Sequence, residues 1–124
     1  PMFVAMAIAL AIGMVGTSIV PAHHERSLHR FFTDREIAYC RQRQYHQYAS
    51  FAGIFAAKEA LFKALGTGFR QGKWTDVEID HTELGAPFFR LYGYYQEAVK
   101  AKAVQTPVVS ISHDGDYAVA QVIM

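Results

Sequence analysis

The stretch YASFAGIFAAKEALFKAL, residues 48–65, decides the fold class because it carries the strongest helix preference in the chain. Ala, Leu, Phe, Lys and Glu dominate it, and most of these residue types favour a helical backbone. Gly66 follows where a left-handed C-terminal cap is common. The pattern therefore predicts one long helix, followed by a loop at Gly66-Thr67-Gly68 with a permissive backbone.

Two predicted β-hairpins, with a helix between them, follow the long helix. The segments are a strand at 74–80, a turn at Gly85-Ala86-Pro87, a strand at 88–92, a helix at 94–104, a strand at 108–112 and a strand at 117–124. Asp114-Gly115, between the last two strands, is typical of tight hairpin turns. Strands paired in hairpins and interspersed with helices indicate an α+β fold, with an antiparallel sheet packed on the long helix.

A short helix is predicted before the long one, over residues 34–43. Thr33 is its candidate N-cap, and Glu36 stands where a capping box is completed. Arginines outnumber carboxylates around this segment. Its surface is interpreted either as a solvated helical face or as a docking surface for an acidic protein partner.

The N-terminal segment is unusual because residues 2–20 carry no formal charge, and Glu25 is the first charged residue. A stretch of this length is close to the roughly 20 apolar residues that span a bilayer. However, no basic region precedes it, as a signal peptide would require. We therefore predict an apolar lead-in at 1–12 and a core strand at 15–20 that Pro21 ends, and we favour this interpretation over a membrane role.

Composition favours a single globular domain over residues 1–124. The chain is 52% hydrophobic and 19% charged, which excludes a disordered protein. Its net charge of +1 gives no general attraction to nucleic acid. Cys40 is the one cysteine, so no intramolecular disulfide can form, and a reducing compartment such as the cytoplasm is expected.

Glu59 and Lys63 are the first candidates for chemistry, because residues four apart share one face of a helix. A carboxylate can hold Mg²⁺ whose remaining ligands are phosphates, and a nearby lysine can neutralise phosphate charge. Backbone N–H groups of the Gly66–Gly68 loop can contact a pyrophosphate. The simpler alternative is a surface Glu-Lys pair worth a few tenths of a kcal/mol.

A second candidate is the run Ser110-Ile111-Ser112-His113-Asp114. A Ser-His-Asp hydrolase triad is disfavoured, because neighbours on a strand point to opposite faces. The simpler interpretation is a hairpin whose turn follows His113.

Three segments together resemble the holo-[acyl-carrier-protein] synthases, which are group-I phosphopantetheinyl transferases. FFTDREIAYC at 31–40 resembles the family pattern F-T-x-x-E-x-x-Y-C. FAGIFAAKEALFKALGTG at 51–68 resembles R-F-A-A-K-E-A…K-A-x-G-T-G, and SISHDGDYAVA at 110–120 resembles S-x-S-H-x-x-x-Y-A-x-A. The G-x-P hairpin lies between them, so order and spacing agree from about residue 31 to the C-terminus.

This resemblance implies a 4′-phosphopantetheinyl transferase-like fold and a Mg²⁺-dependent reaction. The family transfers 4′-phosphopantetheine from coenzyme A to a serine of apo acyl carrier protein and releases 3′,5′-ADP, a step in fatty acid and lipid biosynthesis. It further implies a cytoplasmic homotrimer with sites at the subunit interfaces.

The resemblance also assigns roles to residues of this chain. Glu59 would be a Mg²⁺ ligand, and Lys63 would contact the phosphates and serve as a proton donor. Coenzyme A would be bound by Lys63, Gly66, Thr67, Gly68, Ser112 and His113. Arg41 and Arg43 would dock the acidic carrier protein.

Two positions depart from the family pattern. The family's first strand, G-x-G-x-D-I-V, supplies a second metal ligand, but Ser18 stands at the place of that aspartate. Ile54 stands in place of the arginine before F-A-A-K-E-A, which removes a phosphate partner. An alternative function is therefore a catalytically weakened protein of the same fold that binds coenzyme A and the carrier; a membrane-tethered version is a further alternative.

Overall fold

The structure is a computed structural model, and it describes residues 6–12, 25–66, 71–103, 105–114 and 117–124. In chain order its elements are β1 (Met6–Ile12), α2 (Glu25–Phe31), α3 (Asp34–Gln42), a 3-10 turn at Gln44–His46, α4 (Gln47–Ala64), a 3-10 turn at Trp74–Asp76, β2 (Val77–His81), β3 (Pro87–Leu91), α5 (Gly93–Lys102), β4 (Val108–Asp114) and β5 (Tyr117–Ile123). The predicted α+β fold, its long helix and both hairpins are confirmed.

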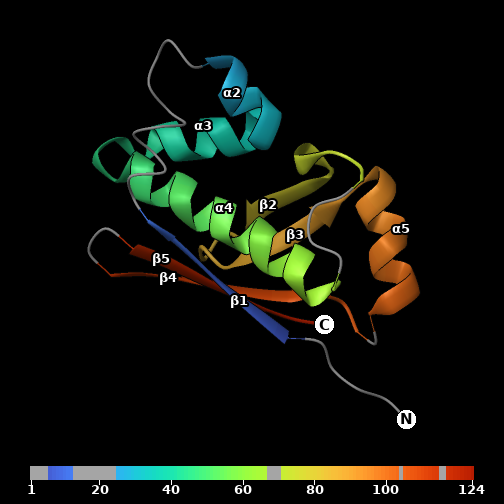
Figure 1. Cartoon of the computed structure of the whole chain (residues 1–124). Coiled ribbons are helices and arrows are strands. Elements are labelled where there is room, and N and C mark those ends of the chain that lie inside the picture. Colours follow the sequence, from blue (N-terminus) through green and yellow to red (C-terminus); the bar gives the residue numbers. More distant parts are fainter. Residues whose placement is uncertain (1–5, 13–24, 67–70, 104, 115–116) are drawn as a thin grey trace.

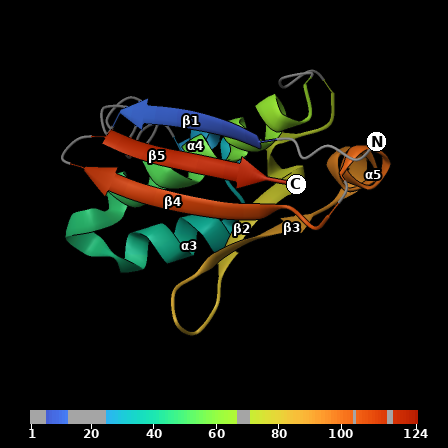
Figure 2. The same cartoon turned by 90° about the horizontal axis from the view of Figure 1, so that it is seen from below.

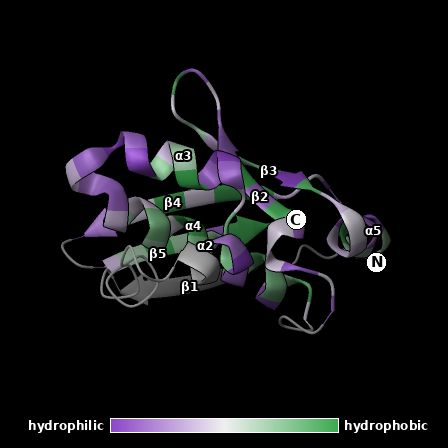
Figure 3. Cartoon of the chain, turned by 90° about the horizontal axis from the view of Figure 1, so that it is seen from above, coloured by the Kyte–Doolittle hydropathy of each residue, from purple (hydrophilic) through white to green (hydrophobic). Residues whose placement is uncertain are grey.

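An antiparallel sheet of order β1-β5-β4 carries α4 across one face (Figure 1). The β2–β3 hairpin forms a second small sheet, and α5 lies at its far end (Figure 1). Ala56, Ala57 and Ala60 of α4 are fully buried. Because these side chains are small, the helix axis can come close to its neighbours, and α4 is the apolar centre of the molecule (Figure 3).

The two faces of the β4–β5 hairpin differ in burial. Val109, Ala118, Ala120 and Val122 are buried on the inner face, toward α4. On the outer face, Val108, Tyr117 and Val119 are exposed by 58%, 49% and 37%. In Figure 2, which looks onto this face, no described helix covers it. The outer face therefore exposes three apolar side chains beside the polar Ser110 and Ser112.

A buried ion pair joins α4 to α3. Lys58 and Glu36 have fully buried side chains, and Lys58 Nζ lies 2.8 Å from Glu36 Oε1. The same ammonium donates to the carbonyl oxygens of Phe31 at 2.6 Å and Trp74 at 3.2 Å. All three ammonium protons therefore have acceptors, which is the condition under which a buried lysine is tolerated.

Glu36 also completes the predicted capping box of α3. Its Oε1 accepts from the Thr33 backbone N–H at 2.8 Å, and Thr33 Oγ1 accepts from the Glu36 N–H. Its Oε2 accepts from the Ile79 N–H of β2 at 2.8 Å. One carboxylate thus ties together α3, α4 and β2, and it fixes the orientation of the helix that carries Glu59.

The first strand of the structure lies within the segment that the sequence analysis treats as an apolar lead-in. Residues 1–12 were expected to be a lead-in, yet Met6–Ile12 pairs along its whole length with β5, from Met6 opposite Ile123 to Ile12 opposite Tyr117. The sequence does not predict β1 because a continuous apolar run has no alternation that marks its paired residues. The segment expected as a strand, 15–20, lies outside the described residues. No helix in the described part of the chain is long and apolar enough to cross a membrane.

Candidate active site

Glu59 and Lys63 lie one turn apart on α4, as their spacing predicts. Glu59 is half-buried, and Lys63 is exposed. Partial burial raises the pKa of the Glu59 carboxyl, and the Lys63 ammonium opposes this increase. Among the described residues none donates a hydrogen bond to the Glu59 carboxylate, so none of them competes with an outside ligand for its oxygens.

An aromatic cluster supports the face of α4 that carries Glu59. Phe55 and Phe62 lie four residues before and three residues after Glu59. Trp74 stacks on Phe55 with ring centroids 5.0 Å apart and meets the Phe62 ring edge-on at 5.0 Å. The Phe31 ring of α2 meets the Trp74 ring edge-on, with ring centroids 5.1 Å apart. Interlocked rings of this kind hold the backbone around Glu59 in one conformation.

A small cavity of about 120 Å³ lies further toward the N-terminus of α4. It is lined by Tyr39, Arg43, Ser50, Gly53, Ile54, His81, Gly85, Pro87, Ile111 and His113. These residues come from α3, α4, the β2–β3 hairpin and β4, so the tertiary fold alone brings them together. A guanidinium and two imidazoles make the cavity suited to a phosphate or another anion.

His113 lies against the backbone of α4 at Gly53. A Cβ atom at Gly53 would be 3.0 Å from His113 Cε1 and 2.9 Å from Ile111 Cγ2. Partial burial, followed by the charges of Arg43 and His46, lowers the pKa of His113. An anion in the cavity would have the opposite effect, because it favours the protonated imidazole.

Tyr39 and His81 form the wall opposite α4. Their rings stack with centroids 3.9 Å apart and an interplanar angle of 10°. The Arg43 guanidinium lies 5.6 Å from the centre of the Tyr39 ring. Sequence reasoning missed Tyr39, His81 and Gly53, because no spacing along the chain predicts contacts between α3, β2 and α4.

The structure brings some of the predicted site residues together and separates others. His113 and Arg43 line the cavity, and Ile54 faces it in place of the expected arginine. His113 belongs to β4 itself, because the strand runs two residues beyond the end expected at 112. Ser112 lies on the outer face of β4, opposite Val119, and so points away from His113 within one chain.

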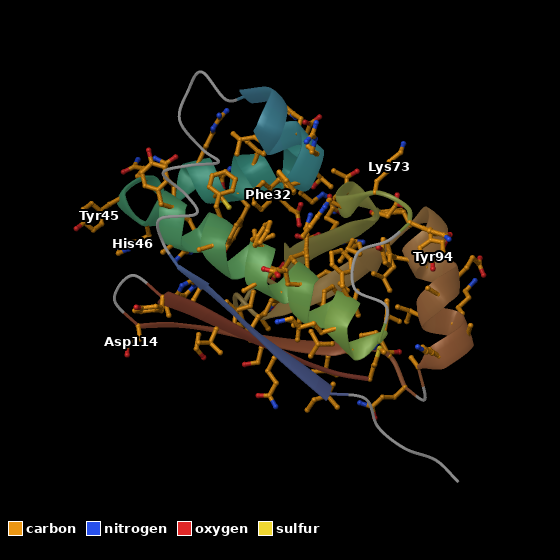
Figure 4. All side chains as sticks on the ribbon, in the orientation of Figure 1. Phe32, Tyr45, His46, Lys73, Tyr94 and Asp114 are labelled. Carbon is orange, nitrogen blue, oxygen red and sulfur yellow. The ribbon has the colours of Figure 1, made fainter. Side chains whose placement is uncertain are left out.

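The remaining predicted residues lie at the two ends of α4 or outside the described chain. Arg41 borders a separate groove with Tyr45 and His46, both of which project from the turn before α4 (Figure 4). Gly66 follows α4 with a φ of +81°, the left-handed conformation predicted for a glycine cap. Ser18, Thr67 and Gly68 lie outside the described residues.

The donor set around Glu59 fits Mg²⁺ held jointly with substrate phosphates. The described residues contain no cluster of three His, Cys, Asp or Glu side chains that could hold a metal ion alone. Mg²⁺, however, commonly takes one or two carboxylates and completes its shell with phosphates and water. The open carboxylate of Glu59, with a lysine one turn away, meets that requirement.

Comparison with known proteins identifies the class of this chain. The model of the 4′-phosphopantetheinyl transferase superfamily matches residues 14–122, so the chain belongs to that superfamily. Its curated relatives narrow this class to the holo-[acyl-carrier-protein] synthases, the family of enzymes to which the chain belongs. The resemblance derived from the three motifs is thereby confirmed.

Individual relatives cover most of the chain. The holo-[acyl-carrier-protein] synthase of Trichlorobacter lovleyi is 46% identical over 99 residues, which are 78% of this chain and 77% of that protein. The Desulforudis audaxviator protein of the same name is 38% identical over 119 residues, 93% and 90% of the two chains. The structure of the Helicobacter pylori holo-[acyl-carrier-protein] synthase in complex with coenzyme A superposes with a TM-score of 0.80 at 30% identity, covering 94% of this chain and 96% of that one.

Proposed function

We propose that this chain transfers 4′-phosphopantetheine from coenzyme A to a serine of apo acyl carrier protein in a Mg²⁺-dependent reaction. The proposal rests on one observation, which is that the two halves of α4 contribute to two different groups of polar residues. Its N-terminal half borders a cavity with Arg43 and His113, and its C-terminal half presents Glu59 and Lys63. One rigid helix therefore links an anion-binding cavity to a carboxylate-lysine pair. The relatives' names and the coenzyme A complexes among similar structures support this reading.

In this reaction, the serine oxygen bonds to the phosphorus next to the pantetheine, and the bond from that phosphorus to 3′,5′-ADP breaks. The serine loses its proton, and Lys63 would donate one to the leaving phosphate. Glu59 would hold Mg²⁺, whose chemistry when bound is neutralisation of the pyrophosphate charge. Such transfer depends mainly on positioning and charge neutralisation, which the fixed α4 provides.

We propose that His113 and Arg43 bind, in the cavity, the part of coenzyme A that lies away from the reacting phosphorus. The rest of the coenzyme A site would be formed by Gly66, Thr67, Gly68 and Ser112. Arg43 thereby has a second proposed role beside carrier docking. Arg41, exposed in the last turn of α3, remains a candidate contact for an acidic carrier.

The proposal is tested by incubating the protein with apo carrier, coenzyme A and Mg²⁺. Mass spectrometry is expected to show the carrier gaining one phosphopantetheine arm and 3′,5′-ADP appearing in equal amount. A carrier of unchanged mass at high enzyme concentration would contradict the proposal.

Gly53→Ala is expected to weaken coenzyme A binding on the order of tenfold, because the new methyl group displaces His113. The free energy of unfolding should fall by no more than about 2 kcal/mol, since the helix gains about 1 kcal/mol and overpacking costs about 1–3 kcal/mol. Calorimetry of Gly53→Ala, His113→Ala and the double variant measures this. If His113 is the affected group, the double variant binds no worse than His113→Ala; additive losses would show that Gly53 acts otherwise.

We further propose a homotrimer in which the outer face of the β4–β5 hairpin contacts a neighbouring subunit. The exposed Val108, Tyr117 and Val119 support this, and Ser112 on the same face would then reach a neighbour's site. Val119→Glu is expected to lower the mass measured by light scattering from three chains to one. Leu84→Glu, at a side chain that is 99% exposed on the hairpin tip, is the matched control and should remain trimeric. A wild-type monomer would refute the assembly.

A second candidate function is binding without efficient transfer. Ile54 favours it, because an apolar side chain lines the cavity where a cation would strengthen phosphate binding. Calorimetric binding of coenzyme A with no transfer would support this candidate. Recovery of transfer in Ile54→Arg or Ser18→Asp would then identify the cause. The proposed location is the cytoplasm, with which the buried free thiol of Cys40 is compatible.

A further inference from the structure

The C-terminal end of α4 is electrostatically the wrong end of a helix for an anion. Helix dipoles place about half a negative charge at the C-terminus, where the last carbonyl groups have no partner within the helix. Anion sites normally use the opposite end. Yet Lys63 lies in the last turn of α4, and Gly66 comes directly after its C-cap residue, Leu65. A phosphate site here therefore needs a cation that offsets the carbonyl groups.

Lys102, the last residue of α5, supplies such a cation. Its ammonium donates a hydrogen bond to the carbonyl oxygen of Leu65, the C-cap residue of α4. The ammonium also lies 3.2 Å from the point where a Cβ on Gly66 would stand. One of its three protons is used by Leu65, so the charge lies directly at the junction between the helix and the loop.

The helix that carries Lys102 is anchored independently of this contact. Tyr95 is fully buried and Val99 is 6% exposed, so α5 is packed on the core through one face. At its start, the Tyr92 N–H donates to the Asp76 carbonyl at 2.8 Å. Because α5 is fixed in this way, Lys102 can hold the end of α4 in place while neutralising its carbonyl groups.

We propose that Lys102 is a positioning residue of the phosphate site: it offsets the negative end of α4 and holds the junction at Leu65 and Gly66, so that coenzyme A pyrophosphate can bind beside Lys63. This inference rests on the proposed function. It gives α5, to which no motif assigned a role, a part in substrate binding.

The test compares Lys102→Met, which keeps the aliphatic stem, with Lys102→Arg, which keeps the charge. Lys100→Met on the same helix is the matched control. The Lys100 side chain is 66% exposed, and its ammonium forms a long surface ion pair, 3.8 Å from Glu97 Oε1. For each protein, calorimetry gives the Kd of coenzyme A, and the transfer assay gives KM and kcat. Lys102→Met is expected to raise Kd and KM about fivefold to tenfold, with kcat within about twofold of wild type. Lys102→Arg and Lys100→Met should stay within about twofold of wild type.

Two results would overturn the inference while the proposed function stands. In the first, Lys102→Met binds coenzyme A as Lys100→Met does, so only net charge matters. In the second, Lys102→Met lowers kcat and melting temperature without raising KM, and Lys102→Arg does not recover either; the contact is then purely structural. A wild-type protein that neither binds coenzyme A nor modifies the carrier would instead refute the proposed function, and the role of Lys102 with it.

Discussion

Glu59→Gln is expected to lower the rate of phosphopantetheine transfer at least about 100-fold. Loss of a group that merely orients a metal ligand costs about 10–100-fold, so loss of the ligand charge itself should cost at least the upper value. The fold should be unaffected, because Glu59 is half-buried and accepts no hydrogen bond from another described residue. Replacing the charged carboxylate with a neutral amide should also remove the free-energy cost of burying a charge. Burial raises the pKa of Glu59, which shows that its surroundings disfavour the charged form.

The measurement is the initial rate of carrier modification at several Mg²⁺ concentrations. Wild type should lose activity in EDTA and regain it with Mg²⁺, whereas Glu59→Gln should remain slow even at high Mg²⁺. Glu97→Gln, which removes a 73% exposed carboxylate on α5, is the matched control and should resemble wild type. If Glu59→Gln is as fast as Glu97→Gln, the metal site lies elsewhere and α4 does not carry the reaction centre.

The local signals in the sequence were sufficient for most elements. Thr33 with Glu36 forms the predicted capping box, and Gly66 adopts the left-handed conformation expected after α4. Glu59 and Lys63 share a helix face because helical periodicity fixes that relation without tertiary contacts. These features depend on residues within four positions of one another, and sequence patterns are strongest at that range.

The rest of the site depends on contacts between distant segments. His113 reaches Gly53 across 60 positions of the chain, and Tyr39 stacks on His81 from another element. Neither pair follows a spacing rule. The uninterrupted apolar run at β1 carries no alternation, so its register is set only by β5. The sequence predicts Lys58 only as part of a helical motif, although its side chain, like that of Glu36, is fully buried.

Lys58→Met is expected to lower the free energy of unfolding by about 3–5 kcal/mol, because it leaves Glu36 buried without its cation. The loss should depend on pH. Burial already raises the pKa of Glu36, and Lys58 is the main group opposing this. Without Lys58, the folded-state pKa lies further above the unfolded value of about 4.3. A carboxyl of this kind contributes stability below its unfolded pKa and loses it as the pH rises toward the folded pKa.

Urea unfolding at pH 5 and pH 8, at one protein concentration, separates this effect from loss of packing. Lys58→Met should be closer to wild type at pH 5, where Glu36 takes up a proton more readily, and further from it at pH 8. Lys58→Met/Glu36→Gln removes both charges while glutamine keeps the capping box, so its stability should exceed that of Lys58→Met at pH 8 and vary less with pH. Equal losses at both pH values, unrelieved by the second substitution, would mean that Lys58 acts through the Phe31 and Trp74 carbonyl groups rather than through Glu36. The ion pair would then be a consequence of helix placement, not its cause.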